Sequence, residues 1–328
     1  MTLPLVISLG DPAGVSPELI AAAWARREAE ALPPFFAVGG AGLLASAGAV
    51  PIVRIGDPGE AAAAFAHGLP VLGELDADCR PGEPNPEGAA FALASLTEAT
   101  RLAVTGAASG LVTGPIAKSR LAELGFDYPG QTEFVAAACG IAAEDAVMLL
   151  AGPSLRTVPL TVHVALADVP RLVTTDLIVR KGRIIAASLA RDFGITRPRI
   201  AVTALNPHAG EEGRFGTEDR DIVAPAIAIL QAEGIAATGP HSADGLFTPR
   251  ARETYDVALC MYHDQALVPL KALDFDQGVN LTLGLPIVRT SPDHGTAFGI
   301  AGRGMADPGA TIAAIRMAGE CAARRAGG

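Results

Sequence analysis

The sequence has little charge and few aromatic side chains. Only 18% of its 328 residues are charged, 5% are aromatic, and the formal net charge is -10. Such an excess of acidic groups repels a phosphate backbone, which argues against nucleic acid as a partner. A phosphorylated small molecule is not excluded, because the local charges of a cleft outweigh a distant net charge under physiological screening. Half of the residues are hydrophobic, so we expect a sizeable core in two lobes or one large domain.

Cysteines are also scarce, and none stand at the spacing of a disulfide framework or a cysteine-ligated zinc site. The four are Cys79, Cys139, Cys260 and Cys321. Their scatter favours the reducing cytoplasm. The short apolar run at residues 3–9 has no basic leader, so we interpret it as a first strand and not as a signal peptide. No apolar stretch is long enough to span a bilayer.

Two common nucleotide-binding motifs are missing as well. No Gly-x-Gly-x-x-Gly pattern follows the first predicted strand, which disfavours an ordinary Rossmann dinucleotide site. The turn Gly10-Asp11-Pro12-Ala13-Gly14 lacks the Gly-Lys-Ser/Thr ending of a P-loop. If this chain binds a nucleotide, it uses a different binding motif.

Short apolar runs alternate with longer helical patterns, which predicts an α/β fold with a largely parallel sheet. We expect strands at residues 5–9, 35–38, 111–113, 147–151, 158–164, 200–205, 257–262 and 279–283. Helix starts are indicated by capping residues followed by Pro or Glu. The expected caps are Ser16, Asn85, Thr132 and Asp307.

Three histidines stand at or just beyond the carboxyl ends of predicted strands, where ligands bind in open α/β sheets. They are His163, His208 and His263. Three neutral imidazoles with an open position can hold a divalent metal such as zinc, cobalt, nickel or manganese. The alternative is that each is a hydrogen-bonded core histidine. Their equivalent positions at three strand ends favour a metal site.

Two carboxylates accompany the histidines. Asp264 directly follows His263, and Asp244 lies three residues after His241. Either carboxylate could orient an imidazole, add a metal ligand or move a proton. Each could equally cap a turn.

Candidate anion-binding residues occur in two regions. The segment Gly130-Gln131-Thr132-Glu133-Phe134 opens a predicted helix, whose free amides and positive dipole end favour an anion. Lys271, Asn280 and Arg289 lie in the carboxyl-terminal third, and a guanidinium at position 289 can clamp a carboxylate or phosphate. Taken singly, each is also compatible with a solvated surface group.

A polar, glycine-rich loop begins at Asp293-His294-Gly295-Thr296-Ala297 and continues through Ile300-Ala301-Gly302-Arg303-Gly304. It resembles the adenosine-binding loop of isocitrate and isopropylmalate dehydrogenases, which share His-Gly, a small residue and Ala, then Ala-Gly further on. The loop is therefore a candidate binding site for NAD or NADP. It could also be a turn that needs glycine torsions.

Taken together, these segments resemble the 4-hydroxythreonine-4-phosphate dehydrogenase family over nearly the whole chain. The matching stretches are residues 10–18, Val112-Thr113-Gly114-Pro115 with Lys118, residues 130–134, His163, residues 206–210, residues 262–265, residues 278–285 and residues 289–304. The resemblance implies an isocitrate/isopropylmalate dehydrogenase-like fold with two α/β/α domains flanking an active-site cleft. We expect one domain at residues 1–135 with 281–328 and a metal-binding, dimerising domain at residues 136–280.

The resemblance also implies an enzyme and its ligands. The expected reaction is NAD(P)-dependent oxidation of 4-phosphooxy-L-threonine, with decarboxylation of the product to 3-amino-2-oxopropyl phosphate, in pyridoxal phosphate synthesis. The expected cofactors are NAD or NADP and a divalent metal, Zn, Mg, Co or Mn. Metal ligands would be His163 and His208 of one subunit and His263 of the other, in a homodimer with shared sites. Substrate contacts would be Gln131, Thr132, Lys271, Asn280 and Arg289.

One position departs from the family pattern. The family usually has His before the threonine of its Gly-His-Thr-Glu motif, and this chain has Gln131. A glutamine can donate a hydrogen bond to phosphate, but it cannot titrate. Substrate affinity and its pH dependence are therefore the properties that this substitution puts in doubt.

Several alternatives remain open at this level. Related enzymes oxidise phosphorylated erythronate or threonate, or aromatic dihydrodiols. A three-histidine zinc hydrolase would fit the histidines but leave the loop at residues 293–304 without a purpose. A non-catalytic phosphometabolite-binding protein would need neither metal nor nicotinamide. For the proton-transfer group of a dehydrogenase, the candidates are Asp244, Asp264 and Lys271.

Overall fold

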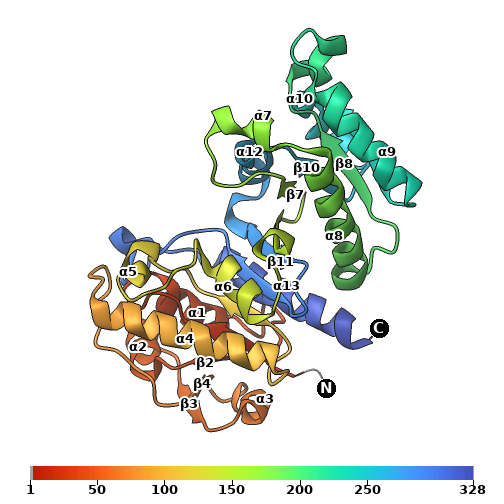
Figure 1. The fold of residues 1–328 in the computed structure, drawn as a ribbon. Helices are drawn as coiled ribbons and strands as arrows, with labels where there is room; N and C mark the ends of the chain where they lie inside the picture. Colours follow the sequence, from red (N-terminus) through yellow and green to blue (C-terminus); the bar gives the residue numbers. More distant parts are fainter. Residues whose placement is uncertain (1–2, 328) are drawn as a thin grey trace. The chain divides into compact units, whose positions relative to one another are not determined.

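The protein, described over residues 3–327 by a computed structural model, consists of two compact units (Figure 1). Unit 1 comprises Met1–Ala146 and Leu285–Gly328, and unit 2 comprises Val147–Gly284. The carboxyl-terminal segment, blue in Figure 1, thus belongs to the same unit as the amino-terminal strands. The two connections fall after residues 146 and 284, compared with 135 and 280 in the sequence-based expectation.

Unit 1 contains strands that all pair in parallel. Their spatial order is β3 (Ile52–Ile55), β4 (Leu69–Leu72), β2 (Phe35–Val38), β1 (Leu5–Ser8), β5 (Leu111–Thr113) and β12 (Arg289–Pro292). The helices are α1 (Ser16–Ala25), α2 (Ala41–Ala47), α3 (Ala61–Ala64), α4 (Pro86–Val104), α5 (Lys118–Ala122), α6 (Gln131–Ala138) and α13 (Gly309–Gly327). Short 3₁₀ turns lie at η1 (Pro58–Glu60), η2 (Ala143–Asp145) and η7 (Phe298–Ile300).

The central strands of unit 1 are buried along their whole length. All four residues of β1 and of β2 are buried, as expected for a parallel sheet covered on both faces. Helix α4, orange in Figure 1, packs on β1, β2 and β5, whereas α13 packs on β12, β5 and β1. Phe35 and Phe36 are fully buried, and each contributes about 1.5–3 kcal/mol by leaving water.

Unit 2 contains a mixed sheet. Its spatial order is β11 (Val279–Leu283), β6 (Val147–Ala151), β7 (Arg156–Pro159), β10 (Val257–Cys260), β8 (Arg199–Thr203) and β9 (Ala236–His241). Strand β6 is antiparallel to both neighbours, and β7, β10, β8 and β9 run parallel. The helices are α7 (Val169–Leu172), α8 (Thr175–Phe193), α9 (Ala224–Ala232), α10 (Ala243–Leu246), α11 (Pro249–Arg252) and α12 (His263–Asp274), and the short turns are η3 (Leu166–Asp168), η4 (Pro207–Gly213), η5 (Asp219–Val223) and η6 (Phe275–Gln277).

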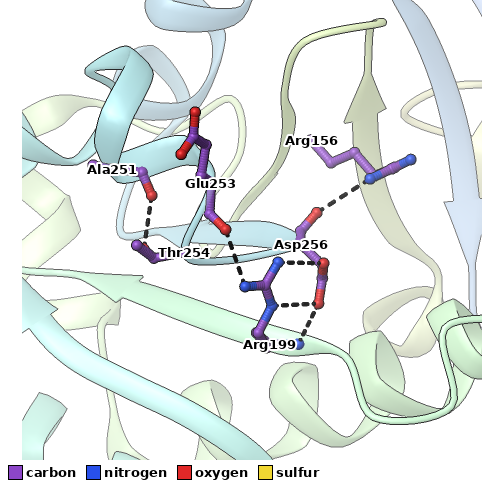
Figure 2. Close-up of polar contacts among 6 residues, drawn as sticks. All are labelled: Arg156, Arg199, Ala251, Glu253, Thr254 and Asp256. Carbon is purple, nitrogen blue, oxygen red and sulfur yellow. Dashed lines mark hydrogen bonds and ion pairs between the residues drawn. The ribbon is translucent and has the colours of Figure 1, made fainter.

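A carboxylate clamp fixes the starts of β8 and β10 (Figure 2). Asp256, directly before β10, accepts hydrogen bonds from the backbone N (2.8 Å), Nε (3.1 Å) and Nη2 (2.9 Å) of Arg199, the first residue of β8. Arg199 Nη1 also donates to the carbonyl of Glu253 at 3.0 Å. These hydrogen bonds from Arg199 lower the pKa of Asp256. The clamp lies at the amino-terminal edge of these strands, opposite the edge that carries the histidines.

The α/β class is confirmed, but several predicted strands end early. Residues 158–164, 200–205 and 257–262 were expected to be strands, whereas β7, β8 and β10 end at Pro159, Thr203 and Cys260. Strands β3, β4, β9 and β12 were not predicted. Their sequences lack a plain apolar run, because Arg54 interrupts β3, proline stands in β4 and β9, and β12 has the sequence Arg-Thr-Ser-Pro.

Two predicted helix caps are confirmed and two are wrong. Asn85 Oδ1 accepts from the N–H of Gly88 at 2.7 Å, and Asp307 Oδ1 accepts from Gly309 at 2.7 Å. Ser16 is the first residue of α1, and the residue before it is Val15. Likewise Thr132 lies inside α6, which starts one residue earlier, and its hydroxyl has another partner, described below.

None of the helices within residues 3–327 combines the length and apolar character that a membrane crossing requires.

Candidate active site

The three predicted histidines follow three neighbouring parallel strands of unit 2. His163 comes four residues after β7, His208 lies in the turn η4 after β8, and His263 is the first residue of α12 after β10. Strand β10 pairs with both β7 and β8, so the carboxyl ends of the three strands lie side by side at one edge. In sheets of this type, that edge is where ligands bind.

His163 and His263 face each other across a small cavity. Their ring centroids are 5.6 Å apart, and the cavity, of about 290 Å³, is also lined by Thr161, Leu166 and Tyr262. Two imidazoles that bind one tetrahedral metal through bonds of about 2 Å have centroids roughly 5 Å apart. The observed spacing therefore suits a shared divalent ion. Asp264 lies beside this pair, with Oδ1 2.8 Å from Nδ1 of His263.

His208 lines a separate cavity of about 280 Å³, together with Asp244, Gln265 and Tyr262. Its backbone has a φ of 52°, in the left-handed region that non-glycine residues rarely adopt, and His163 has a φ of 53°. Such conformations cluster at functional sites. Ser242 donates a 2.6 Å hydrogen bond to Asp244 and lowers the pKa of that carboxyl group.

Among the described residues, the three histidines of one chain are not gathered at a single point. Within residues 3–327, no three His, Cys, Asp or Glu side chains are grouped closely enough to hold an ion. The donor types suit zinc and related divalent metals, since imidazole is a preferred ligand of these ions. One chain thus supplies a facing pair of imidazoles and a third one in the adjoining cavity.

Unit 1 brings three of the predicted substrate residues together. Arg289, on β12, is 3% exposed, and it donates hydrogen bonds to Thr132 Oγ1 at 3.2 Å and Thr113 Oγ1 at 2.7 Å. Gln131 Nε2 donates to the carbonyl of Gly114, directly after β5, at 3.1 Å. Burial lowers the pKa of Arg289 to about 10, and the nearby charge of Glu133 opposes this shift. The guanidinium is therefore a cation at physiological pH, held at the start of α6.

Two amide oxygens of predicted substrate residues are buried without a hydrogen-bond donor among the described residues. In unit 1 this is Oε1 of Gln131, and in unit 2 it is Oδ1 of Asn280 on β11. An unsatisfied buried acceptor is uncommon, and a ligand that donates a hydrogen bond would satisfy it. Lys271 also belongs to unit 2, where it lies exposed near the end of α12.

Lys118 is a basic residue of this region that the sequence analysis did not assign to the site. A methyl group placed on Gly130 would lie 3.4 Å from Lys118 Nζ and 3.1 Å from Glu133 Oε2, so both side chains flank the start of α6. The signal that could have identified it was its place in the matching stretch after Pro115. A lysine at this helix start adds positive charge where an anion would bind.

The predicted nucleotide loop packs on the glycine turn after β1. The N–H of Val15 donates to the carbonyl of Thr296 at 3.0 Å. A methyl group on Gly14 would lie only 2.7 Å from that carbonyl oxygen, so only glycine permits this approach. His294 Nδ1 lies 2.9 Å from the carbonyl of Gly295, and its Nε2 is buried without a partner among the described residues.

Comparisons with known proteins show the family of this chain. The family model of the pyridoxal phosphate biosynthetic protein PdxA matches residues 34–318. A protein of Erythrobacter litoralis named 4-hydroxythreonine-4-phosphate dehydrogenase is 63% identical over 328 residues, and the match covers 98% of each chain. The crystal structure of a 4-hydroxythreonine-4-phosphate dehydrogenase from Klebsiella pneumoniae matches with a TM-score of 0.87 and 35% identity, over 98% of each chain.

A more distant structure has a different name. A terephthalate 1,2-cis-dihydrodiol dehydrogenase from Burkholderia xenovorans matches with a TM-score of 0.66 and 28% identity, over 97% of this chain and 99% of that one. The isocitrate/isopropylmalate dehydrogenase-like fold expected from the sequence is consistent with these matches. The family model spans most of the chain, and the Erythrobacter relative is similar from end to end. This chain belongs to the PdxA family of pyridoxal phosphate biosynthetic proteins.

Proposed function

We propose that this protein is a dehydrogenase that oxidises 4-phosphooxy-L-threonine in pyridoxal 5'-phosphate biosynthesis. The secondary alcohol becomes a ketone, giving 2-amino-3-oxo-4-phosphooxybutanoate. The new ketone is one carbon from the carbon that carries the carboxylate, so the product readily loses carbon dioxide and leaves 3-amino-2-oxopropyl phosphate. The names of the Erythrobacter and Klebsiella relatives support this substrate.

The observation that carries the proposal is the buried cation at the start of α6. Arg289 is oriented by Thr113 and Thr132, so its guanidinium is held in place before a substrate arrives. A preorganised guanidinium beside a helix amino terminus suits the doubly charged phosphate of the substrate. Gln131 adds an amide to the same region, and Lys118 adds a second positive charge.

We assign the nicotinamide cofactor, NAD or NADP, to the loop that contains His294, Gly295, Thr296 and Ala297. Its close contact with the glycine turn after β1 supports this assignment, because that contact fixes the loop against unit 1. When bound, the nicotinamide accepts the hydride of the substrate alcohol. The role of this chain is to hold the cofactor and to exclude competing reactions.

We assign a divalent metal, Zn, Mg, Co or Mn, to His163, His208 and His263. When bound, the metal supplies Lewis-acid polarisation of the substrate oxygen. Asp264 contacts Nδ1 of His263 and orients its imidazole, which leaves Nε2 to bind the metal. Three groups of unit 2 are candidates to move the alcohol proton, namely Asp244, Asp264 and Lys271. The amide of Asn280 would donate a hydrogen bond to the substrate or accept one from it.

A related oxidation is the main alternative. The Burkholderia xenovorans match favours an aromatic dihydrodiol, but its TM-score of 0.66 is below the 0.87 of the Klebsiella structure. Phosphorylated erythronate and threonate are further candidates. The test is an absorbance assay of nicotinamide reduction with each of these substrates. Preferred turnover of 4-phosphooxy-L-threonine supports the proposal, and preferred turnover of another substrate contradicts it. No nicotinamide reduction with any of them would favour the zinc hydrolase or a non-catalytic binding protein.

We further propose a homodimer with shared active sites, working in the cytoplasm. Large apolar side chains of unit 2 are strongly exposed, with exposed fractions of 68% at Leu166, 63% at Val268 and 72% at Phe275. Leu166 also lines the cavity of His163 and His263. A second copy of the chain would cover such groups. It would also supply the imidazole that a single chain does not bring to the metal.

Mixed dimers of inactive variants test the shared site. A dimer of one His208→Ala chain and one His263→Ala chain keeps one intact site if His208 and His263 act from different subunits. Random reassociation makes about half of the dimers mixed, so about a quarter of the wild-type activity should return. Mixing His163→Ala with His263→Ala restores activity only if these two ligands come from different subunits. Confirmed subunit exchange without any recovery in either mixture would contradict a shared site.

A further inference from the structure

The carboxylate of Asp219 anchors the segment that leads to His208. Its Oδ1 accepts the N–H of Leu205 at 2.7 Å, and its Oδ2 accepts the N–H of Asn206 at 3.0 Å and Nδ2 of Asn206 at 3.1 Å. Asp219 is 1% exposed and begins η5, eleven residues after His208 in the chain. These three hydrogen bonds tie the end of β8 to η5, two residues before the histidine.

The turn between these points is tightly closed and has an unusual backbone. Residues 208–212 all have positive φ angles, and four of them are not glycine. A left-handed residue other than glycine costs about 1–2 kcal/mol, so surrounding contacts must hold this turn in place. A methyl group on Gly210 would lie 2.9 Å from the carbonyl oxygen of Gly216, so the turn also folds against itself. Asp219 anchors Leu205 and Asn206, which come shortly before these strained residues in the chain.

We propose that Asp219 is a positioning residue that holds His208 in its metal-binding geometry. The inference rests on the proposed metal site and adds a residue to it. A carboxylate is suited to this role, because it has two acceptor oxygens and meets two consecutive N–H groups. An asparagine at position 219 would have one acceptor oxygen, so one N–H would face an NH₂ donor. The turn would then be free to rotate His208 away from the ion.

Asp256 provides a matched control. It also accepts a backbone N–H of β8, that of Arg199 at 2.8 Å, but at the opposite end of the strand (Figure 2). Asp256→Asn and Asp219→Asn therefore make the same chemical change at the two ends of one strand. Both variants should be less stable than the wild type. Only Asp219→Asn should change the metal site.

The experiment is calorimetric titration of Zn²⁺ into the full-length, chelator-treated protein. We expect Asp219→Asn to bind Zn²⁺ about 10–100-fold more weakly than the wild type, the usual effect of losing a group that orients a ligand. Asp256→Asn should bind with wild-type affinity. In a His208→Ala background, Asp219→Asn should cause little further loss, because Asp219 acts through that histidine.

Each outcome decides the inference. Wild-type affinity in Asp219→Asn, or an equal loss in Asp256→Asn, overturns it and leaves the proposed function standing. A wild type that binds no Zn²⁺ overturns the metal assignment and the inference with it. If Asp219→Asn does not fold, Asp219→Glu is compared with Asp256→Glu. The longer carboxylate at position 219 should weaken Zn²⁺ binding several-fold and the one at position 256 should not, and equal affinities contradict the role.

Discussion

The hydroxyl of Thr203 donates a 2.7 Å hydrogen bond to Oε1 of Gln265, which joins the last residue of β8 to α12. The same oxygen accepts the N–H of Met261 at 2.7 Å, and Nε2 of Gln265 donates to the carbonyl of Ala204 at 2.8 Å. One amide side chain thus links the segment before His208 with the segment before His263.

Replacing Gln265 with methionine should destabilise unit 2. The change keeps the length of the side chain but leaves the carbonyl of Ala204 without its donor, and the N–H of Met261 keeps only its longer 3.3 Å hydrogen bond to Thr203 Oγ1. A buried polar group without a partner costs about 1–3 kcal/mol, and we expect a loss of this size in the unfolding free energy. The measurement is denaturant unfolding monitored by circular dichroism. Gln277→Met, at an exposed glutamine, is the control, and equal stability of both variants would show that the amide does not join the strands.

Lys181 predicts a pH dependence of stability. Burial lowers its pKa from 10.5 to about 8, and its Nζ donates to the carbonyl of Leu160 at 2.8 Å. Between these pKa values the unfolded chain binds more protons than the folded chain, so this lysine makes the unfolding free energy rise with pH, by up to about 1.4 kcal/mol per unit. Below the folded pKa the full cost of burying the charge is present.

The check compares the wild type with Lys181→Met, which cannot titrate. We expect the wild type to gain stability relative to the variant between about pH 8 and about pH 10.5. A difference that stays constant over this range would mean that Lys181 has an ordinary pKa.

Replacing Gly14 with alanine should weaken cofactor binding. The added methyl group would lie 2.7 Å from the carbonyl oxygen of Thr296, so the loop at residues 293–304 must move. We expect the KM for the nicotinamide cofactor to rise roughly tenfold, equivalent to about 1.4 kcal/mol, with little change in metal affinity. Gly56→Ala, where the new methyl group has an ordinary 3.7 Å contact, serves as the control. The loop assignment fails if both variants have the same KM.

Replacing Arg289 with lysine should weaken substrate binding although the charge is kept. An ammonium group cannot reproduce the planar fork that contacts Thr113 and Thr132. Hydrogen bonds to a charged group are worth about 1.5–3 kcal/mol, so the KM for 4-phosphooxy-L-threonine should rise roughly tenfold to a hundredfold. Arg54→Lys, which changes an exposed ion pair with Glu74, should leave this KM unchanged. An unaltered KM in Arg289→Lys would remove this residue from the phosphate site.

Residues on regular elements could be predicted from the sequence. The apolar runs before His163, His208 and His263 indicated three strands, and those strands do lie side by side in unit 2. The glycine-rich loop and Arg289 were likewise identified from local patterns. The hydrogen-bond partners of Arg289 were not identified in this way, because Thr113 and Thr132 come from segments far away in the chain.

Other features depend on contacts that no local pattern reports. Asp219 belongs to no sequence motif. Its role follows only from its burial and from its hydrogen bond with Leu205, just after β8. The left-handed turn at residues 208–212 contains only one glycine in that range, so its backbone could not be inferred from glycine content. Strand β9 was missed because its Gly239 and Pro240 are typical of turns.

The most direct test of the account is the metal dependence of 4-phosphooxy-L-threonine oxidation. Chelator-treated wild-type protein should not reduce nicotinamide with this substrate, and added Mn²⁺, Zn²⁺ or Co²⁺ should restore turnover. His208→Ala should remain folded, as measured by circular dichroism, and inactive at the same metal concentrations. Full activity of the metal-free wild type, or wild-type turnover by His208→Ala, would contradict the account.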